Sequence, residues 1–208
     1  MSFKKNGYQI VKNAISRELC DFICTYLLLK ENATINMYQN KLVKPHDYFG
    51  VFGDDQMNGF EKDKSKWKDH SYSCYGDLVI ETLCAQLTPK MEKLTKLKLV
   101  PTYCYFRIYE NGSILKKHTD RPACEISSTI FFGGDKWPIF VDGKKVDLKE
   151  SDILIYKGFD LPHWREEFKG RKCVQAFMHW NDINGPYGIK NRFDGRPCLG
   201  YPQGNPIR

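Results

Sequence analysis

The chain has 208 residues, of which 41% are hydrophobic, 14% aromatic and 27% charged, and its formal net charge is +7 at neutral pH. This length suits one well-packed domain, and the composition excludes a largely disordered chain. The lysines are dispersed and form no single basic block, so the charge favours a solvated surface over a nucleic-acid footprint.

The N-terminus and the cysteines bear on the cellular setting. The first residues, MSFKKNG, lack the apolar core of a signal peptide, and no run of about 18 apolar residues is present for a membrane span. The eight cysteines are irregularly spaced and include no C-x-x-C pair. We therefore expect free thiols in a cytoplasmic protein that acts in solution, without a membrane partner.

We expect one domain with three parts, which are a helical flank over residues 1–100, a β core over residues 101–180 and an irregular wrap over residues 181–208. The last part is rich in Gly, Pro and Asn, the residue types that interrupt regular structure. Within it, Arg192 and Arg196 either lie on the surface or pin the wrap to the core.

The helical flank shows start and stop signals. Residues 8–14 alternate as a short strand does, and Ser16 is placed to cap an amphipathic helix over residues 17–30. Asp77 is placed to cap a second helix, which we expect to be kinked or restarted at Pro89 because proline removes a helical donor.

Between these helices, residues 31–75 show no helical or strand period but carry scattered aromatic side chains. A long connection inside a compact domain is typically functional. We expect a mobile cover on the substrate side of the protein, with a purely structural wrap as the alternative. We expect His46 and His70, which lie in this segment, to be surface or hydrogen-bonded histidines.

From residue 103 the pattern changes to strands and turns. Successive residues of a strand point to opposite faces of the sheet. One face of the first strand is apolar and should pack on the helices, with Cys104, Phe106 and Ile108. The other face should point into a barrel, with Tyr103, Tyr105, Arg107 and Tyr109.

A metal site is predicted from His118, Asp120 and His163. In an extended segment residues i and i+2 share a face, so the H-x-D sequence places an imidazole beside a carboxylate. If the sheet returns His163 to the same mouth, two histidines and one carboxylate form a facial triad. That triad leaves positions open for a cosubstrate and O2, and it is typical of non-haem Fe(II).

Several motifs in the core occur in a definite order. They are R-x-Y-x-x-G at residues 107–112, HTDR at 118–121, CEIS at 124–127, WPIFVDG at 137–143, HWRE at 163–166 and QAFMHW at 175–180. With these motifs, residues 103–180 resemble the core of the 2-oxoglutarate and Fe(II)-dependent dioxygenases, nearest to the prolyl 4-hydroxylase-like branch. The resemblance implies a mainly β fold with flanking helices around a double-stranded β-helix (jelly roll, cupin-like) core.

The resemblance also implies Fe(II), 2-oxoglutarate and O2 as cofactors, with a buried cation for the far carboxylate of 2-oxoglutarate. Tyr109 stands where related hydroxylases have a tyrosine that hydrogen-bonds this cosubstrate. Residues an even number of positions apart on a strand point to the same face, so Arg171 would share a face with Gln175. Arg171 is therefore our first choice for the cation. Its spacing from His163, the distal histidine of the trio, is shorter than in the family, so Arg165 and Arg107 remain alternatives.

For the reaction, the resemblance implies decarboxylation of 2-oxoglutarate to succinate and CO2 with hydroxylation of an unactivated C–H bond. By analogy, the substrate is a prolyl residue of a peptide or protein, or a small molecule, with Arg107, Arg121 and Tyr105 on the substrate side. We expect no catalytic residues beyond the metal ligands. The alternatives are a non-catalytic cupin-like metal-binding protein and an oxidative nucleic-acid demethylase, and a nucleic acid is the less favoured partner.

Overall fold

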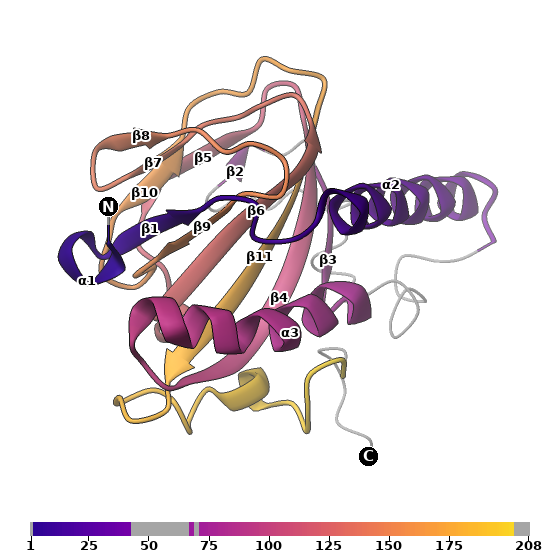
Figure 1. Ribbon diagram of the computed structural model, residues 1–208. Coiled ribbons are helices and arrows are strands. Elements are labelled where there is room, and N and C mark those ends of the chain that lie inside the picture. The colour runs from indigo at the N-terminus through magenta and orange to yellow at the C-terminus, as the bar shows by residue number, and fades with distance from the viewer. Residues whose placement is uncertain (1, 43–66, 69–70, 202–208) are drawn as a thin grey trace.

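The computed structural model describes residues 2–42, 67–68 and 71–201. Two antiparallel β-sheets face each other, and helices α2 (Arg17–Gln39) and α3 (Leu78–Thr95) pack on the outer face of the larger sheet (Figure 1). A short helix, α1 (Phe3–Asn6), precedes the first strand and was not predicted. The mainly β architecture with flanking helices agrees with the fold predicted from the sequence.

The larger sheet has six strands in the spatial order β1-β9-β6-β11-β4-β3. Strands β4 and β11 are far apart in sequence, yet they pair along almost their whole length at the centre of this sheet. The bounds of its strands are Tyr8–Val11 (β1), Ser71–Tyr75 (β3), Leu99–Glu110 (β4), Ile126–Gly134 (β6), Ile153–Tyr156 (β9) and Lys172–Asp182 (β11).

The smaller sheet has five strands in the order β2-β5-β10-β7-β8. Its strands are short, and β5 and β10 lie side by side although more than forty residues separate them. Their bounds are Trp67–Lys68 (β2), Ile114–His118 (β5), Ile139–Val141 (β7), Lys144–Val146 (β8) and His163–Arg165 (β10). Two 3-10 turns complete the elements, Pro122–Cys124 (η3) and Arg192–Gly195 (η4).

Strand β4 separates two hydrophobic cores. Its outward residues Cys104, Phe106 and Ile108 pack with the helices, as predicted. Its inward tyrosines pack between the two sheets, in one hydrophobic cluster with Ile139 and Val141 of the smaller sheet. The alternation of side chains along one strand therefore builds both the support for the helices and the lining of the barrel.

Helix α2 continues well past the predicted end near Lys30. The carboxylate of Glu31 is buried and lies 2.5 Å from Lys172 Nζ on β11, and Thr34 Oγ1 lies 3.0 Å from the Tyr72 hydroxyl on β3. These contacts tie the second half of the helix to the larger sheet. The helical period was lost in the sequence because the buried positions here are polar.

The predicted cover over residues 31–75 is therefore wrong at both of its ends. Its first part belongs to α2, and its last part forms strands β2 and β3. Residues 43–66 and 69–70, with His46 and His70, lie outside the described residues.

The predicted helix starts are confirmed. Ser16 Oγ accepts a hydrogen bond from a first-turn N–H of α2, and Asp77 Oδ1 accepts from the N–H groups of Val79 and Ile80 at 3.0 and 3.1 Å. The predicted restart at Pro89 is wrong, because α3 runs through this residue as one helix.

After β11 the chain is irregular, as expected, and one arginine pins it. The guanidinium of Arg196 is buried, with Nη2 2.5 Å from Glu81 Oε1 on α3 and Nη1 2.6 Å from the carbonyl oxygen of Tyr201. Arg192, by contrast, is exposed. Of the two arginines considered from the sequence, Arg196 is the anchor of the wrap.

The described ranges contain no helix long and apolar enough to cross a bilayer. None of the eight cysteines forms a disulfide, and six of them are buried. Burial raises the pKa of the Cys173 thiol to about 11. Buried thiols of this kind are protonated and pack as small apolar groups.

Candidate active site

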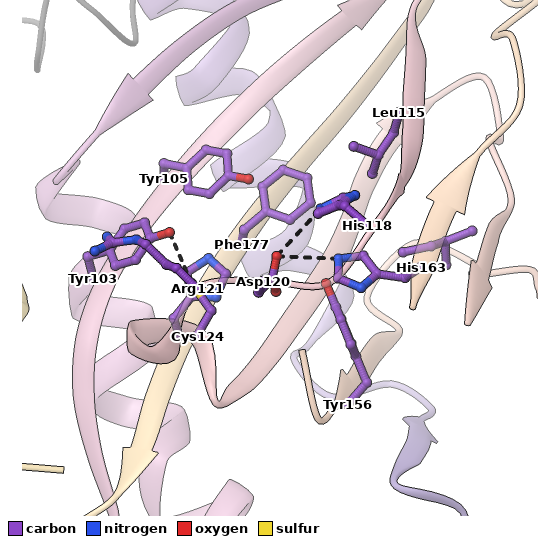
Figure 2. A pocket seen from close by; sticks show the side chains of 12 residues that line it. Tyr103, Tyr105, Leu115, His118, Asp120, Arg121, Cys124, Tyr156, His163 and Phe177 are labelled. Carbon is purple, nitrogen blue, oxygen red and sulfur yellow. Dashed lines mark hydrogen bonds and ion pairs between the residues drawn. The ribbon is translucent and has the colours of Figure 1, made fainter. Parts of the chain in front are cut away.

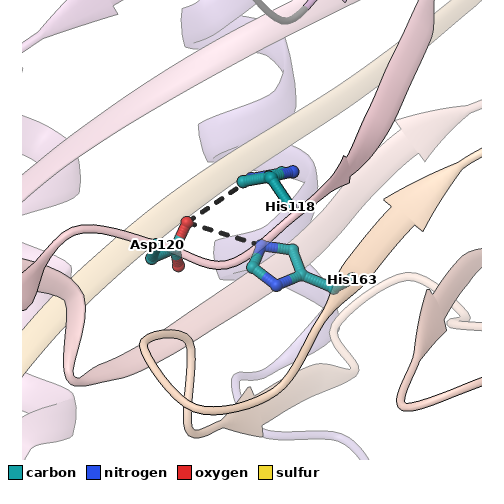
Figure 3. A group of neighbouring side chains, drawn as sticks. All are labelled: His118, Asp120 and His163. Atoms are coloured by element: carbon teal, nitrogen blue, oxygen red, sulfur yellow. Dashed lines mark ion pairs between the residues drawn. The ribbon is translucent and has the colours of Figure 1, made fainter.

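The pairing of two short strands brings two of the predicted ligands together. His118 ends β5 and His163 begins β10, and these residues are direct partners across the antiparallel pair. Their ring centroids are 4.3 Å apart. Asp120 lies just past the end of β5, and its Oδ1 is 3.5 Å from His118 Nε2 and 3.4 Å from His163 Nε2 (Figure 3). The predicted trio thus meets at one point, with its ligand atoms within 4.8 Å of one another.

Backbone carbonyls orient both imidazoles. His118 Nδ1 lies 2.7 Å from the carbonyl oxygen of Lys116, and His163 Nδ1 lies 3.0 Å from that of Leu161. A carbonyl oxygen can only accept, so each Nδ1 carries a proton and donates it. Nε2 is then the ring atom that can bind a metal, and this second-sphere bond is the usual way of orienting a metal-ligating histidine.

The carboxylate of Asp120 is held by a similar arrangement. The Ser127 hydroxyl donates to Asp120 Oδ2 at 2.8 Å, which leaves Oδ1 toward the histidines. A Cβ at Gly158 would overlap both Ser127 Oγ and Asp120 Oδ2, so only glycine fits there. Burial would raise the pKa of Asp120, but His118 and His163, when both nitrogens of their rings are protonated, outweigh it with hydrogen bonds from Nε2 and hold the pKa well below its usual range. The donor set is one anion and two imidazoles, which fits a divalent transition metal.

A cavity of about 180 Å³ opens beside this trio (Figure 2). The trio forms one side of the cavity, and aromatic rings of the larger sheet form the other. Tyr105 and Phe177 stack with their centroids 4.7 Å apart, and Tyr103 stacks on Tyr105 at 6.1 Å. The space next to the candidate metal position is therefore walled by flat, mostly apolar surfaces.

A second feature lies deeper in the barrel, where Arg165 is 1% exposed. Its Nη2 donates to Gln175 Oε1 at 2.8 Å, its Nη1 donates to the carbonyl oxygen of Trp137, and its guanidinium lies 5.0 Å from the Trp137 ring centroid. Its Nε and the buried hydroxyl of Tyr109 have no hydrogen-bond partner among the described residues. Burial lowers the pKa of Arg165, and within the described chain no carboxylate pairs with it. A buried cation without an anion is costly, so the geometry suits an anionic ligand.

The structure does not place Arg171, the first choice for the cosubstrate cation, on an inward strand face. Its side chain is exposed, and its backbone N–H donates to Asp135 Oδ2 at 2.7 Å in the turn before β11. Strand parity does not apply to it, because β11 begins at the next residue, Lys172. Both alternatives, Arg165 and Arg107, are buried.

The three residues predicted on the substrate side have different environments. Tyr105 and Arg121 line the cavity. Both terminal nitrogens of Arg121 lie 2.9 Å from the carboxylate of Asp194, so the wrap holds this side chain at the cavity rim. Arg107 is buried, and its Nη1 donates to Ser71 Oγ at 2.9 Å. Arg107 is absent from the cavity wall, so the structure does not bring it to the substrate side.

Three site residues had no role in the sequence prediction, which are Ser127, Gln175 and His179. All three lie on inward faces of β6 or β11, which strand parity indicates. Their roles depend on contacts between strands, and no sequence signal shows those. Burial lowers the pKa of His179 to about 4, so this imidazole is neutral.

No protein-family model and no curated protein matches this sequence. Solved structures do share its fold. A prolyl-4-hydroxylase from Pseudomonas putida is similar with a TM-score of 0.61 at 12% identity, over 86% of this chain and 94% of that one. EctD from S. alaskensis is similar with a TM-score of 0.61 at 12% sequence identity, over 100% of this chain and 86% of that one. HygX from Streptomyces hygroscopicus, solved with nickel and 2-oxoglutarate, is similar with a TM-score of 0.58 at 9% sequence identity, over 88% of this chain and 85% of that one. The chain has the double-stranded β-helix fold of the 2-oxoglutarate and Fe(II) oxygenases, as its motifs predicted.

Proposed function

We propose that this protein is a non-haem Fe(II) and 2-oxoglutarate-dependent dioxygenase that hydroxylates an unactivated C–H bond. One observation carries the proposal. A single barrel contains both a His–Asp–His trio oriented for metal binding and, deeper inside, a buried arginine with no anion among the described residues. The reaction requires these two sites together.

His118 Nε2, His163 Nε2 and Asp120 Oδ1 would hold the metal, with Nδ1 bonds and Ser127 keeping these atoms in place. When bound, Fe(II) would supply the activation of O2 for oxidation of a C–H bond, with 2-oxoglutarate as the reductant. The rings of Tyr105 and Phe177 would keep water from the substrate side of the cavity.

Arg165 would bind the far carboxylate of 2-oxoglutarate, and the Tyr109 hydroxyl would donate a second hydrogen bond to it. A planar guanidinium suits a carboxylate because its N–H groups match the two oxygens. Gln175 holds Arg165 from the neighbouring sheet. Strand β10 thus supplies the arginine, and β11 supplies the amide oxygen that accepts from it.

A non-catalytic cupin-like metal protein would need neither the buried arginine nor the buried tyrosine hydroxyl, so this pair favours the enzyme. For the substrate, we propose a prolyl residue of a peptide or protein. The support is analogy, since a prolyl hydroxylase from Trichoplax adhaerens solved with a peptide fragment shares the fold with a TM-score of 0.54 at 14% identity.

Anaerobic titration tests the proposal, with Fe(II) added first and 2-oxoglutarate second, followed by a peptide screen for succinate release in air. We expect one Fe(II) per chain and 2-oxoglutarate binding that requires the metal. Asp120→Ala should keep the fold and lose both binding events. Binding of 2-oxoglutarate without metal, or metal binding that survives Asp120→Ala, would contradict the proposal.

A further inference from the structure

His179 of β11 lines the cavity beside the trio and is 3% exposed. Its Nδ1 lies 3.1 Å from Ser127 Oγ. Its Nε2 has no hydrogen-bond partner among the described residues. A buried polar atom at the wall of a cavity and without a partner indicates that a ligand supplies the missing bond.

The hydrogen bonds around Ser127 decide which role Nε2 plays. The hydroxyl has one hydrogen, and it points to Asp120 Oδ2 at 2.8 Å, with the carbonyl oxygen of Cys124 at 3.2 Å. Both of these oxygens only accept, so the hydroxyl cannot also donate to His179. His179 Nδ1 must therefore donate to Ser127 Oγ, and Nε2 of the neutral ring is an acceptor.

The surroundings of His179 indicate which donor it would take. The ring of Tyr103 lies 4.6 Å away and that of Tyr105 lies 5.9 Å away, between centroids. Bringing a charged donor into this buried place would require stripping its hydration shell, which costs free energy. A neutral N–H or O–H group carries much less of this cost, and the flat aromatic walls suit the carbon atoms attached to it.

We propose that His179 Nε2 is a substrate-binding acceptor, and that the substrate carries a neutral N–H or O–H donor close to the C–H group that faces the metal. This inference rests on the proposed function, because the ligand is a substrate only if the protein is an enzyme. Two successive hydrogen bonds, from His179 to Ser127 and from Ser127 to Asp120, hold the acceptor at a constant place relative to the metal ligands. The acceptor would thereby select which carbon of the substrate is presented.

Nitrogen NMR of protein labelled with ¹⁵N-histidine tests this directly, with and without Zn(II). The His179 signals are assigned by their loss in His179→Asn. The probes are two matched pairs, N-methylacetamide with N,N-dimethylacetamide, and 2-propanol with acetone. We expect a protonated Nδ1 and an unprotonated Nε2, and a saturable shift of the Nε2 signal with each donor probe. The donor-free partner should bind at least about threefold more weakly.

The amide and alcohol pairs distinguish an N–H donor from an O–H donor. A protonated Nε2, equal shifts from donor and donor-free probes, or no shift from any probe would overturn the proposal. This readout needs neither iron nor turnover, so it is separate from the test of the proposed function.

His179→Asn places an amide near the former Nδ1 and removes Nε2, so it should bind metal and 2-oxoglutarate as wild type does. Loss of metal binding in this variant would instead show a structural role for the ring.

Discussion

At the scale of single residues, the two arginines that follow His163 have opposite environments, because Arg165 is buried and Arg171 is exposed. The alternation of side chains along a strand predicted that Arg171 lies on the inward face, but it could not show that β11 begins one residue later. Arg165 lies on a strand of three residues, too short to show any period in the sequence. Its burial follows from the pairing of β10 with two neighbours, and that is a tertiary effect.

We predict that Arg165→Met weakens 2-oxoglutarate binding by about 10-fold or more, because a charge-assisted hydrogen bond contributes roughly 1.5–3 kcal/mol. Methionine keeps most of the buried volume. Calorimetric titration without oxygen, in the presence of metal, measures the change. The matched control is Arg171→Met, which alters an exposed side chain and should titrate as wild type does. The reverse order of effects would return the cosubstrate role to Arg171.

Ser127 gives a second prediction at this scale. Ser127→Ala removes the bond that holds Asp120 Oδ2, and we expect metal affinity to fall by about 10- to 100-fold, as is usual for outer-sphere partners of a metal ligand. The control is Ser128→Ala. Ser128 is equally buried on the same strand, but its hydroxyl donates to the carbonyl of Met178. Competition with a chelator measures both affinities, and equal affinities in the two variants would refute the role of Ser127.

At the scale of elements, the sequence predicted the kinds of element better than their limits. Helix caps at Ser16 and Asp77 are local, and they were correct. The extent of α2 depends on Glu31 meeting Lys172 from a distant strand, so local periodicity could not show it. The restart considered at Pro89 was a local inference too, but α3 packs on the sheet as one continuous helix.

The C-terminal wrap gives a prediction for an element. Arg196→Met leaves the carboxylate of Glu81 buried without its cation, and we expect a loss of about 3–5 kcal/mol in the free energy of unfolding. Arg192→Met changes an exposed side chain and should stay within about 0.5 kcal/mol of wild type. Urea unfolding monitored by circular dichroism compares the two. A similar stability for both variants would show that Arg196 does not anchor the wrap.

At the scale of the whole molecule, the ordered motifs predicted the β-helix fold and the three residues that meet at its mouth. The order was informative because His118 and His163 become neighbours only when β5 and β10 pair. What the sequence could not show is which polar side chains meet inside the barrel. Gln175 and His179 belong to one strand, yet their partners Arg165 and Ser127 come from β10 and β6.

The depressed pKa of His179 predicts a pH dependence of global stability. Its folded pKa of about 4 lies below the ordinary value of about 6.5, so between these values the unfolded chain binds more protons. This contribution to stability is fully present above pH 6.5 and is lost as the pH falls toward 4, with a total of up to about 3 kcal/mol. His179→Asn should therefore lose less stability than wild type over this range in urea unfolding. Parallel curves for the two proteins would contradict the prediction.

The most direct test of the central claim is a crystal structure grown without oxygen in the presence of Ni(II) and 2-oxoglutarate. We predict one metal bound by His118 Nε2, His163 Nε2 and Asp120 Oδ1. We also predict the far carboxylate of 2-oxoglutarate within hydrogen-bond distance of the Arg165 guanidinium and the Tyr109 hydroxyl. A metal bound elsewhere, or a 2-oxoglutarate carboxylate that contacts neither of these groups, would contradict the account.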